Sequence, residues 1–213
     1  MYIENVFVCM AAPLLVGMFV AGRRYYFDFW FILAGMAACL LSAYVNSFFT
    51  GFYHADVISA ASEITPVVEE IIKLFPLLFY LLVFEPEQKK ARIAIIIIDA
   101  SFATFENICW MTENGAARLD YLLLRGFSTG AMHVVCGTLV GYGLVFVWQR
   151  PWLKAAGTMG LLCAAITFHA MYNLLISFPG VIRNIGYGMP IVTAVLCVAG
   201  SRLHRTLDPA DDS

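Results

Sequence analysis

Long apolar runs follow one another along almost the whole sequence, and they restrict the chain to the few folds that a lipid bilayer allows. A helix that crosses a bilayer needs ~20 mostly apolar residues. We count seven such runs, at roughly residues 3–21, 29–49, 64–84, 91–111, 120–147, 153–177 and 185–202. Backbone groups in lipid must satisfy their own hydrogen bonds, and the runs lack the alternation of barrel strands. The sequence therefore predicts an all-α, polytopic transmembrane helical bundle.

Composition leaves no room for a separate soluble domain. Hydrophobic residues make up 61% of the chain and charged residues 13%, against about 25% charged residues in soluble domains. We therefore expect residues 1–213 to form a single integral membrane domain surrounded by lipid. The fifth run is longer than one crossing needs, so it is either a tilted helix or one that begins later, near Arg125. The sequence has no basic patch that would indicate binding to nucleic acid.

The distribution of Lys and Arg predicts how the chain is oriented in the membrane, because basic residues accumulate in cytoplasmic loops. In loops and at the ends of runs, one side holds nine of them: Arg23, Arg24, Lys89, Lys90, Arg92, Arg150, Lys154, Arg202 and Arg205. The other side holds three: Arg118, Arg125 and Arg183. We therefore expect the N-terminus outside and the C-terminus in the cytoplasm, as an odd number of crossings requires.

Polar side chains inside the runs are concentrated in four consecutive spans. They are Glu69, Glu70 and Lys73, then Asp99, Glu106 and Asn107, then Arg125 and His133, and finally His169 and Asn173. An ionised group near the bilayer centre costs at least ~2.5–3.5 kcal/mol, so it usually has a partner and a function. A helical rise of ~1.5 Å per residue places the glutamates and both histidines in the outer half of the membrane. We expect a shared site there.

Each of these residues also has a purely structural explanation. Buried His and Asn side chains often bridge helices, Lys73 can simply neutralise Glu69, and Arg125 can extend to the interface. Asp99, near the middle of its span, receives no role. The set as a whole is too costly for packing alone, which favours a functional site.

Two kinds of hydrolytic chemistry use these residue types. A buried glutamate beside a second carboxylate is a suitable general base for activating water, and His and Asn side chains can donate hydrogen bonds to an oxyanion. Alternatively, two histidines and one or two glutamates can bind Zn²⁺ and leave a further glutamate as the base. Both versions need the same residues, so the residues alone leave both open.

Four short motifs, in order on successive spans, resemble the PrsW family of bacterial intramembrane proteases. They are EEIIK (Glu69–Lys73), FATFEN (Phe102–Asn107), RGFSTGAMH (Arg125–His133) and FHAMYN (Phe168–Asn173). The wider group includes the type II CAAX prenyl endopeptidases and the bacteriocin-immunity membrane proteases. The resemblance covers roughly residues 64–177, which we take as the catalytic core.

The resemblance implies an intramembrane endopeptidase of the bacterial cytoplasmic membrane and roles for individual residues. The implied catalytic residues are Glu69, Glu70, His169 and Asn173, with Lys73, Asn107 and Arg125 in support. Glu106 stands where the prenyl endopeptidases have a histidine, and His133 matches a histidine of the PrsW branch. If a metal is bound, we expect zinc, with ligands from Glu70, Glu106, His133 and His169. Without a metal, Glu69 or Glu70 activates water and His169 and Asn173 hold the oxyanion.

The resemblance also implies a membrane-anchored protein substrate, because PrsW-like proteases make the first, extracytoplasmic-side cut in anti-sigma factors.

A second class of function stays open. A proton- or cation-coupled transporter would also bury Glu, Lys and His, although it would more often show repeats and broken helices. Pro76 is the one hint of a broken span. A non-catalytic scaffold is a third class.

Overall fold

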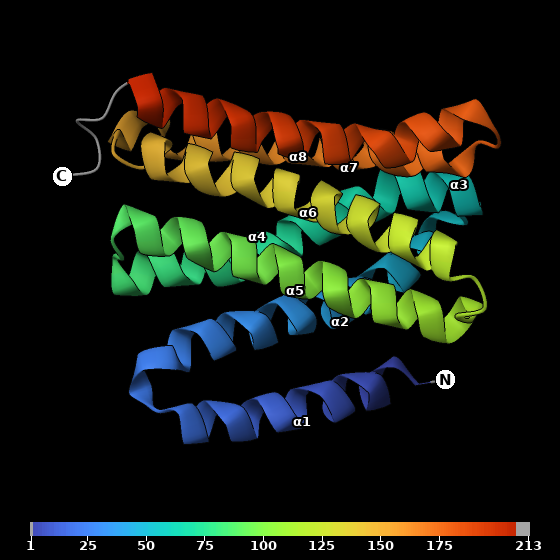
Figure 1. Cartoon of the computed structure of the whole chain (residues 1–213), viewed down its shortest axis with the longest axis horizontal. Helices are drawn as coiled ribbons and strands as arrows, with labels where there is room; N and C mark the ends of the chain where they lie inside the picture. The colour runs from blue at the N-terminus through green and yellow to red at the C-terminus, as the bar shows by residue number, and fades with distance from the viewer. Residues whose placement is uncertain (1, 208–213) are drawn as a thin grey trace.

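The computed structural model describes residues 2–207, with side chains from residue 2 to residue 200, and it is a bundle of long helices (Figure 1). The seven long helices are α1 Ile3–Ala21, α2 Tyr26–Tyr53, α4 Thr65–Phe84, α5 Gln88–Asn114, α6 Leu119–Val147, α7 Lys154–Ser177 and α8 Val181–Leu207. The described part of the chain contains no strand. The predicted all-α bundle is therefore confirmed, and each predicted run corresponds to one helix. The fifth run is a single helix that begins at Leu119 and not near Arg125.

Short helical turns connect some of the long helices. η1 (Arg23–Tyr25) joins α1 to α2, and η3 (Pro151–Leu153) precedes α7. Between α2 and α4 the chain forms α3 (Val57–Ser59) and then η2 (Ala60–Ile64), a π-helical turn that leads directly into α4. Asp56 caps α3, since one of its carboxylate oxygens accepts hydrogen bonds from two backbone N–H groups.

Six helices of the described chain are long and apolar enough to cross a membrane, and α4 differs from them by its charge. It has 20 residues, which is enough for a crossing, but it carries Glu69, Glu70 and Lys73. All three side chains are buried inside the bundle. The charges therefore face protein and not lipid, and α4 lies between the other helices as the seventh long helix. It also continues through Pro76 without interruption.

The long helices run alternately up and down the bundle, so α1 begins at one end and α8 ends at the other (Figure 1). Glu69 lies near the start of α4 and His169 in the second half of α7. Both positions are nearer to the end of the bundle where α1 begins. Glu69 and His169 therefore lie in the same half of the bundle, whereas His133 lies at the middle of α6.

α5 and α6 form the centre of the bundle. α5 packs on α2 and α6, and α6 also packs on α7 and α8. Half of the residues in the most apolar windows of α5 and α6 are buried, against 11% in α1. The buried apolar residues form two clusters: Ile98 and Leu74 belong to one, Phe102 and Ile72 to the other. In the sequence, Asp99 lies between Ile98 of one cluster and Phe102 of the other, and Lys73 lies between Ile72 and Leu74. The polar site therefore occurs where the two apolar clusters adjoin.

Candidate active site

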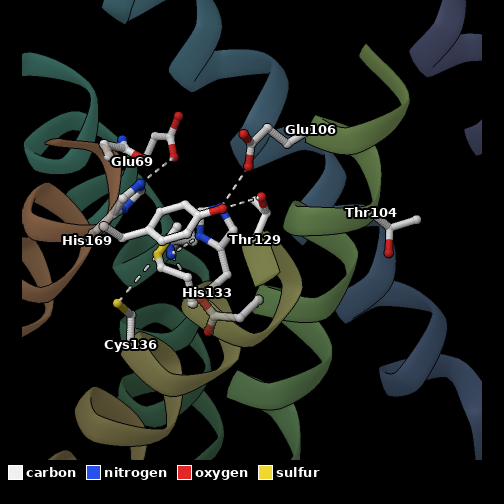
Figure 2. Close-up of polar contacts among 12 residues, drawn as sticks. Glu69, Thr104, Glu106, Thr129, His133, Cys136 and His169 are labelled. Carbon is white, nitrogen blue, oxygen red and sulfur yellow. Dashed lines mark hydrogen bonds and ion pairs between the residues drawn. The ribbon is translucent and has the colours of Figure 1, made fainter. Parts of the chain in front are cut away.

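Seven charged or titratable side chains from four helices meet inside the bundle. They are Glu69, Glu70 and Lys73 of α4, Asp99 and Glu106 of α5, His133 of α6 and His169 of α7. Six of them are buried, and Glu106 is half-buried. Four of the seven, Glu69, Glu106, His133 and His169, are labelled in Figure 2. The sequence prediction of a shared site on these four helices agrees with this arrangement, although Asp99 was given no role there.

Glu69 and Glu70 have different partners because adjacent residues of a helix point about 100° apart. Glu70 faces the bundle centre, where its Oε1 lies 2.6 Å from Lys73 Nζ and 2.9 Å from His169 Nδ1. Glu69 faces α2 and α7. Its Oε1 lies 3.5 Å from Asn46 Nδ2, and its Oε2 lies 3.8 Å from His169 Nε2. Glu70 is therefore paired with a cation, whereas Glu69 has only long contacts.

Lys73 links three of the four helices that form the site. Besides Glu70, its Nζ contacts His133 Nδ1 at 3.0 Å and Asp99 Oδ1 at 3.0 Å. It also lies over the ring of Phe102, 5.1 Å from the centroid. An ammonium group has three donors and no acceptor. Two of these contacts, with Glu70 and His133, are hydrogen bonds, and the contact with Asp99 is an ion pair; together they compensate the cost of burying the charge.

Asp99 fits beside Lys73 only because residue 137 of α6 is glycine. A Cβ atom at Gly137 would lie 1.9 Å from Asp99 Oδ2. Sequence reasoning missed this residue as part of the site. The available signal was a carboxylate in the middle of a span, on the helix that also carries Glu106.

His169 can offer a free ring nitrogen to a ligand. A carboxylate can only accept hydrogen bonds, so the contact with Glu70 assigns the proton of a neutral His169 to Nδ1. The unprotonated Nε2 then lies on the side of Glu69, 3.8 Å from Glu69 Oε2; both side chains are labelled in Figure 2. A histidine oriented by a carboxylate at one nitrogen is the usual arrangement of a metal ligand.

His133 uses both ring nitrogens within the protein. Its Nδ1 accepts from Lys73, so Nε2 carries the proton and donates to Glu106 Oε2 at 2.7 Å. Glu106 also accepts from Arg125 Nη2 at 3.1 Å. The Arg125 guanidinium in turn stacks over Trp110, 4.6 Å from the ring centroid. Of the site carboxylates Glu106 is the most exposed, with 28% of its side chain accessible, so the cluster is least enclosed on its side.

Two asparagines predicted as site residues lie apart from these contacts. Asn173 Nδ2 donates to the backbone carbonyl of Ala61 at 2.9 Å. Asn107 has a buried Oδ1 without a hydrogen-bond partner among the described residues. Asn46, which contacts Glu69, was not predicted as a site residue. Its only signal was a polar side chain near the end of the second run.

Three of the buried groups are close enough to share a metal ion. One ligand atom from each of Glu69, His133 and His169 lies within 4.8 Å of the others. Two histidines and one glutamate are a ligand set of catalytic zinc, so the donor chemistry fits this metal. Binding at His133 requires that it exchange its bond to Glu106 or to Lys73 for the metal. Of the predicted ligands, His133 and His169 belong to this group, while Glu70 and Glu106 contact cationic or histidine side chains.

Seven long helices around a buried set of carboxylates and histidines define a polytopic membrane protein with the groups that hydrolysis requires. The family model of the PrsW family intramembrane metalloproteases matches residues 13–200. The chain therefore belongs to the PrsW family and is an intramembrane protease, and the resemblance inferred from four motifs is confirmed. No curated protein and no solved structure matches the chain.

Proposed function

We propose that this protein is an endopeptidase of the bacterial cytoplasmic membrane that cuts membrane-anchored proteins near the outer side of the membrane. The proposed substrate class is a single-pass anti-sigma factor, and the proposed cut is its first, extracytoplasmic-side cleavage. The charge bias of the loops supports an N-terminus outside and a C-terminus inside. In that orientation the site, which lies nearer the end where α1 begins, is in the outer half. We also propose that residues 1–213 act as one domain.

The observation that carries the proposal is the difference between the two adjacent glutamates. Glu70 is held by Lys73 and His169, and this contact orients the His169 ring. Glu69 is buried but weakly engaged, and it faces His169 Nε2 and the half-buried Glu106 side of the cluster. We therefore assign the reaction to Glu69, which takes a proton from water as the water attacks the peptide carbonyl and gives that proton to the leaving amine as the C–N bond breaks. His169 then stands next to the reacting atoms.

The family description favours a metal and the donor set favours zinc, which Glu69, His133 and His169 would hold. When bound, it would lower the pKa of a water ligand and polarise the substrate carbonyl. In that version Glu106, which is accessible and lies against His133, is the carboxylate left to act as the base. Glu70 orients His169 in either version. Arg125 and Lys73 hold Glu106 and Glu70 in position.

The test is cleavage of a panel of single-pass membrane reporter proteins co-expressed with the protease, with fragments identified by mass spectrometry. General-base catalysis is typically worth ~10²–10⁴-fold, so Glu69→Gln is expected to reduce cleavage by at least about 100-fold. Glu113→Gln is the matched control, since this exposed carboxylate lies at the end of α5. Full activity of Glu69→Gln in a folded protein would contradict the proposal.

A second arm measures zinc by elemental mass spectrometry on detergent-purified protein. About one zinc per chain, lost in His133→Ala and in His169→Ala, would support the metal version, in which Glu69 is a ligand and Glu106 the base. His54→Ala is the control, because His54 is exposed in the α2–α3 connection. A folded, chelator-free protein without zinc would exclude the metal version and leave Glu69 as the base in a metal-free reaction.

A further inference from the structure

Asn173 makes its hydrogen bond at a point where the backbone lacks one of its ordinary donors. In the π-helical turn η2, the N–H of Thr65 bonds to the carbonyl of Ala60, five residues earlier. The same pattern would pair the carbonyl of Ala61 with the N–H of residue 66. Residue 66 is proline, which has no N–H. The Ala61 carbonyl instead accepts from Asn173 Nδ2 at 2.9 Å.

This bond ties the start of α4 to α7. Pro66 is buried and precedes Glu69 by three residues, which is less than one helical turn. On α7, Asn173 lies four residues after His169 and therefore on the same face. One face of α7 thus holds α4 at two points: His169 at the Glu70 side chain and Asn173 at the backbone just before the helix.

We propose that Asn173 is a positioning residue that fixes the first turn of α4, and with it Glu69, by replacing the hydrogen bond that Pro66 removes. The proposal rests on the assignment of Glu69 as the reacting carboxylate. It replaces the oxyanion role that the family resemblance implied for Asn173. A side chain whose amide is directed to the Ala61 carbonyl holds the catalytic helix in place and leaves oxyanion binding to other donors.

A partly buried π-helical turn followed by proline leaves one carbonyl without its backbone donor, and an external donor can replace it. A buried carbonyl without a partner costs free energy comparable to a lost hydrogen bond. Without Asn173, the turn can recover that cost by opening to water or by shifting toward an α-helical register. Either change moves the start of α4 and so alters the position of Glu69 relative to His169.

The experiment uses a substitution that returns the missing donor. Asn173→Ala removes the side-chain amide, and Pro66→Ala supplies a backbone N–H within reach of the Ala61 carbonyl. We expect Asn173→Ala to speed amide hydrogen exchange in residues 62–70 by about two- to ten-fold, the range for one net hydrogen bond. In the double variant Pro66→Ala/Asn173→Ala, exchange should return to the rate of Pro66→Ala alone. Reporter cleavage should fall in Asn173→Ala and recover at least in part in the double variant.

Asn184→Ala is the matched control, because Asn184 is exposed near the start of α8. An oxyanion role predicts the opposite pattern: unchanged exchange in Asn173→Ala without substrate, and loss of cleavage that Pro66→Ala does not restore. That result would overturn the proposal. If Asn173→Ala does not fold, the double variant must still be recovered as folded protein, and its failure would also overturn the proposal. Exchange is measured without substrate, so failure of the proposed protease function would not affect this arm.

Discussion

At the scale of single residues, the buried Asp99 depends on the absence of a side chain at Gly137. A Cβ atom there would lie 1.9 Å from Asp99 Oδ2, so Gly137→Ala must displace the carboxylate that contacts Lys73. We expect a loss of about 1–3 kcal/mol in stability, measured by thermal unfolding in detergent. Gly130→Ala on the same helix is the control, since a Cβ there meets nothing within 4 Å. Equal unfolding temperatures for the Gly137→Ala and Gly130→Ala variants would refute the claim that Asp99 depends on the space at Gly137.

At the scale of one element, α4 remains among the helices because Lys73 compensates the carboxylates around it. Lys73→Met leaves Glu70 and Asp99 without this cation. Breaking a buried ion pair in this way typically costs about 3–5 kcal/mol. Lys90→Met is the control, because its pair with Glu87 is exposed and worth about 0–1 kcal/mol. We expect denaturation in detergent to separate the two variants clearly, and similar stability would argue against this role of Lys73.

At the scale of the whole molecule, the charge bias predicts which loops are accessible from each side of the membrane. A cysteine in place of His54, between α2 and α3, should react with an impermeant maleimide added to intact cells. A cysteine in place of Glu87, between α4 and α5, should react only after the cells are opened. The protein with its native cysteines alone serves as background. The reversed pattern would show the opposite orientation and would place the site in the cytoplasmic half.

Much of the candidate site could be predicted from the sequence because charged residues in apolar runs are few and costly. Glu69, Glu70, Glu106 and the two histidines stand out for that reason alone. Their partners could not be predicted. Which glutamate pairs with Lys73 depends on how α4 is rotated between α2, α5 and α7, and periodicity within α4 does not determine this rotation.

The role of Asn173 shows the same limit. Its place in a family motif suggested a donor to the reaction, whereas its contact is the Ala61 carbonyl. That carbonyl lacks a backbone donor because η2 is π-helical and residue 66 is proline. No sequence signature is strong enough to predict a π-helical turn. The closeness of this turn to Asn173 of α7 is set by the folded chain.

The sequence by itself determined the all-α bundle, the seven long helices and the group of polar side chains, because the cost of exposing backbone and charge to lipid restricts the chain to few solutions. Only the tertiary structure decided that Glu70 is paired while Glu69 is weakly engaged, that Asp99 joins the site through the space at Gly137, and that Asn173 holds the start of α4. These features depend on contacts between helices far apart in the sequence. Such contacts follow from helix packing and rotation, which local sequence patterns do not specify.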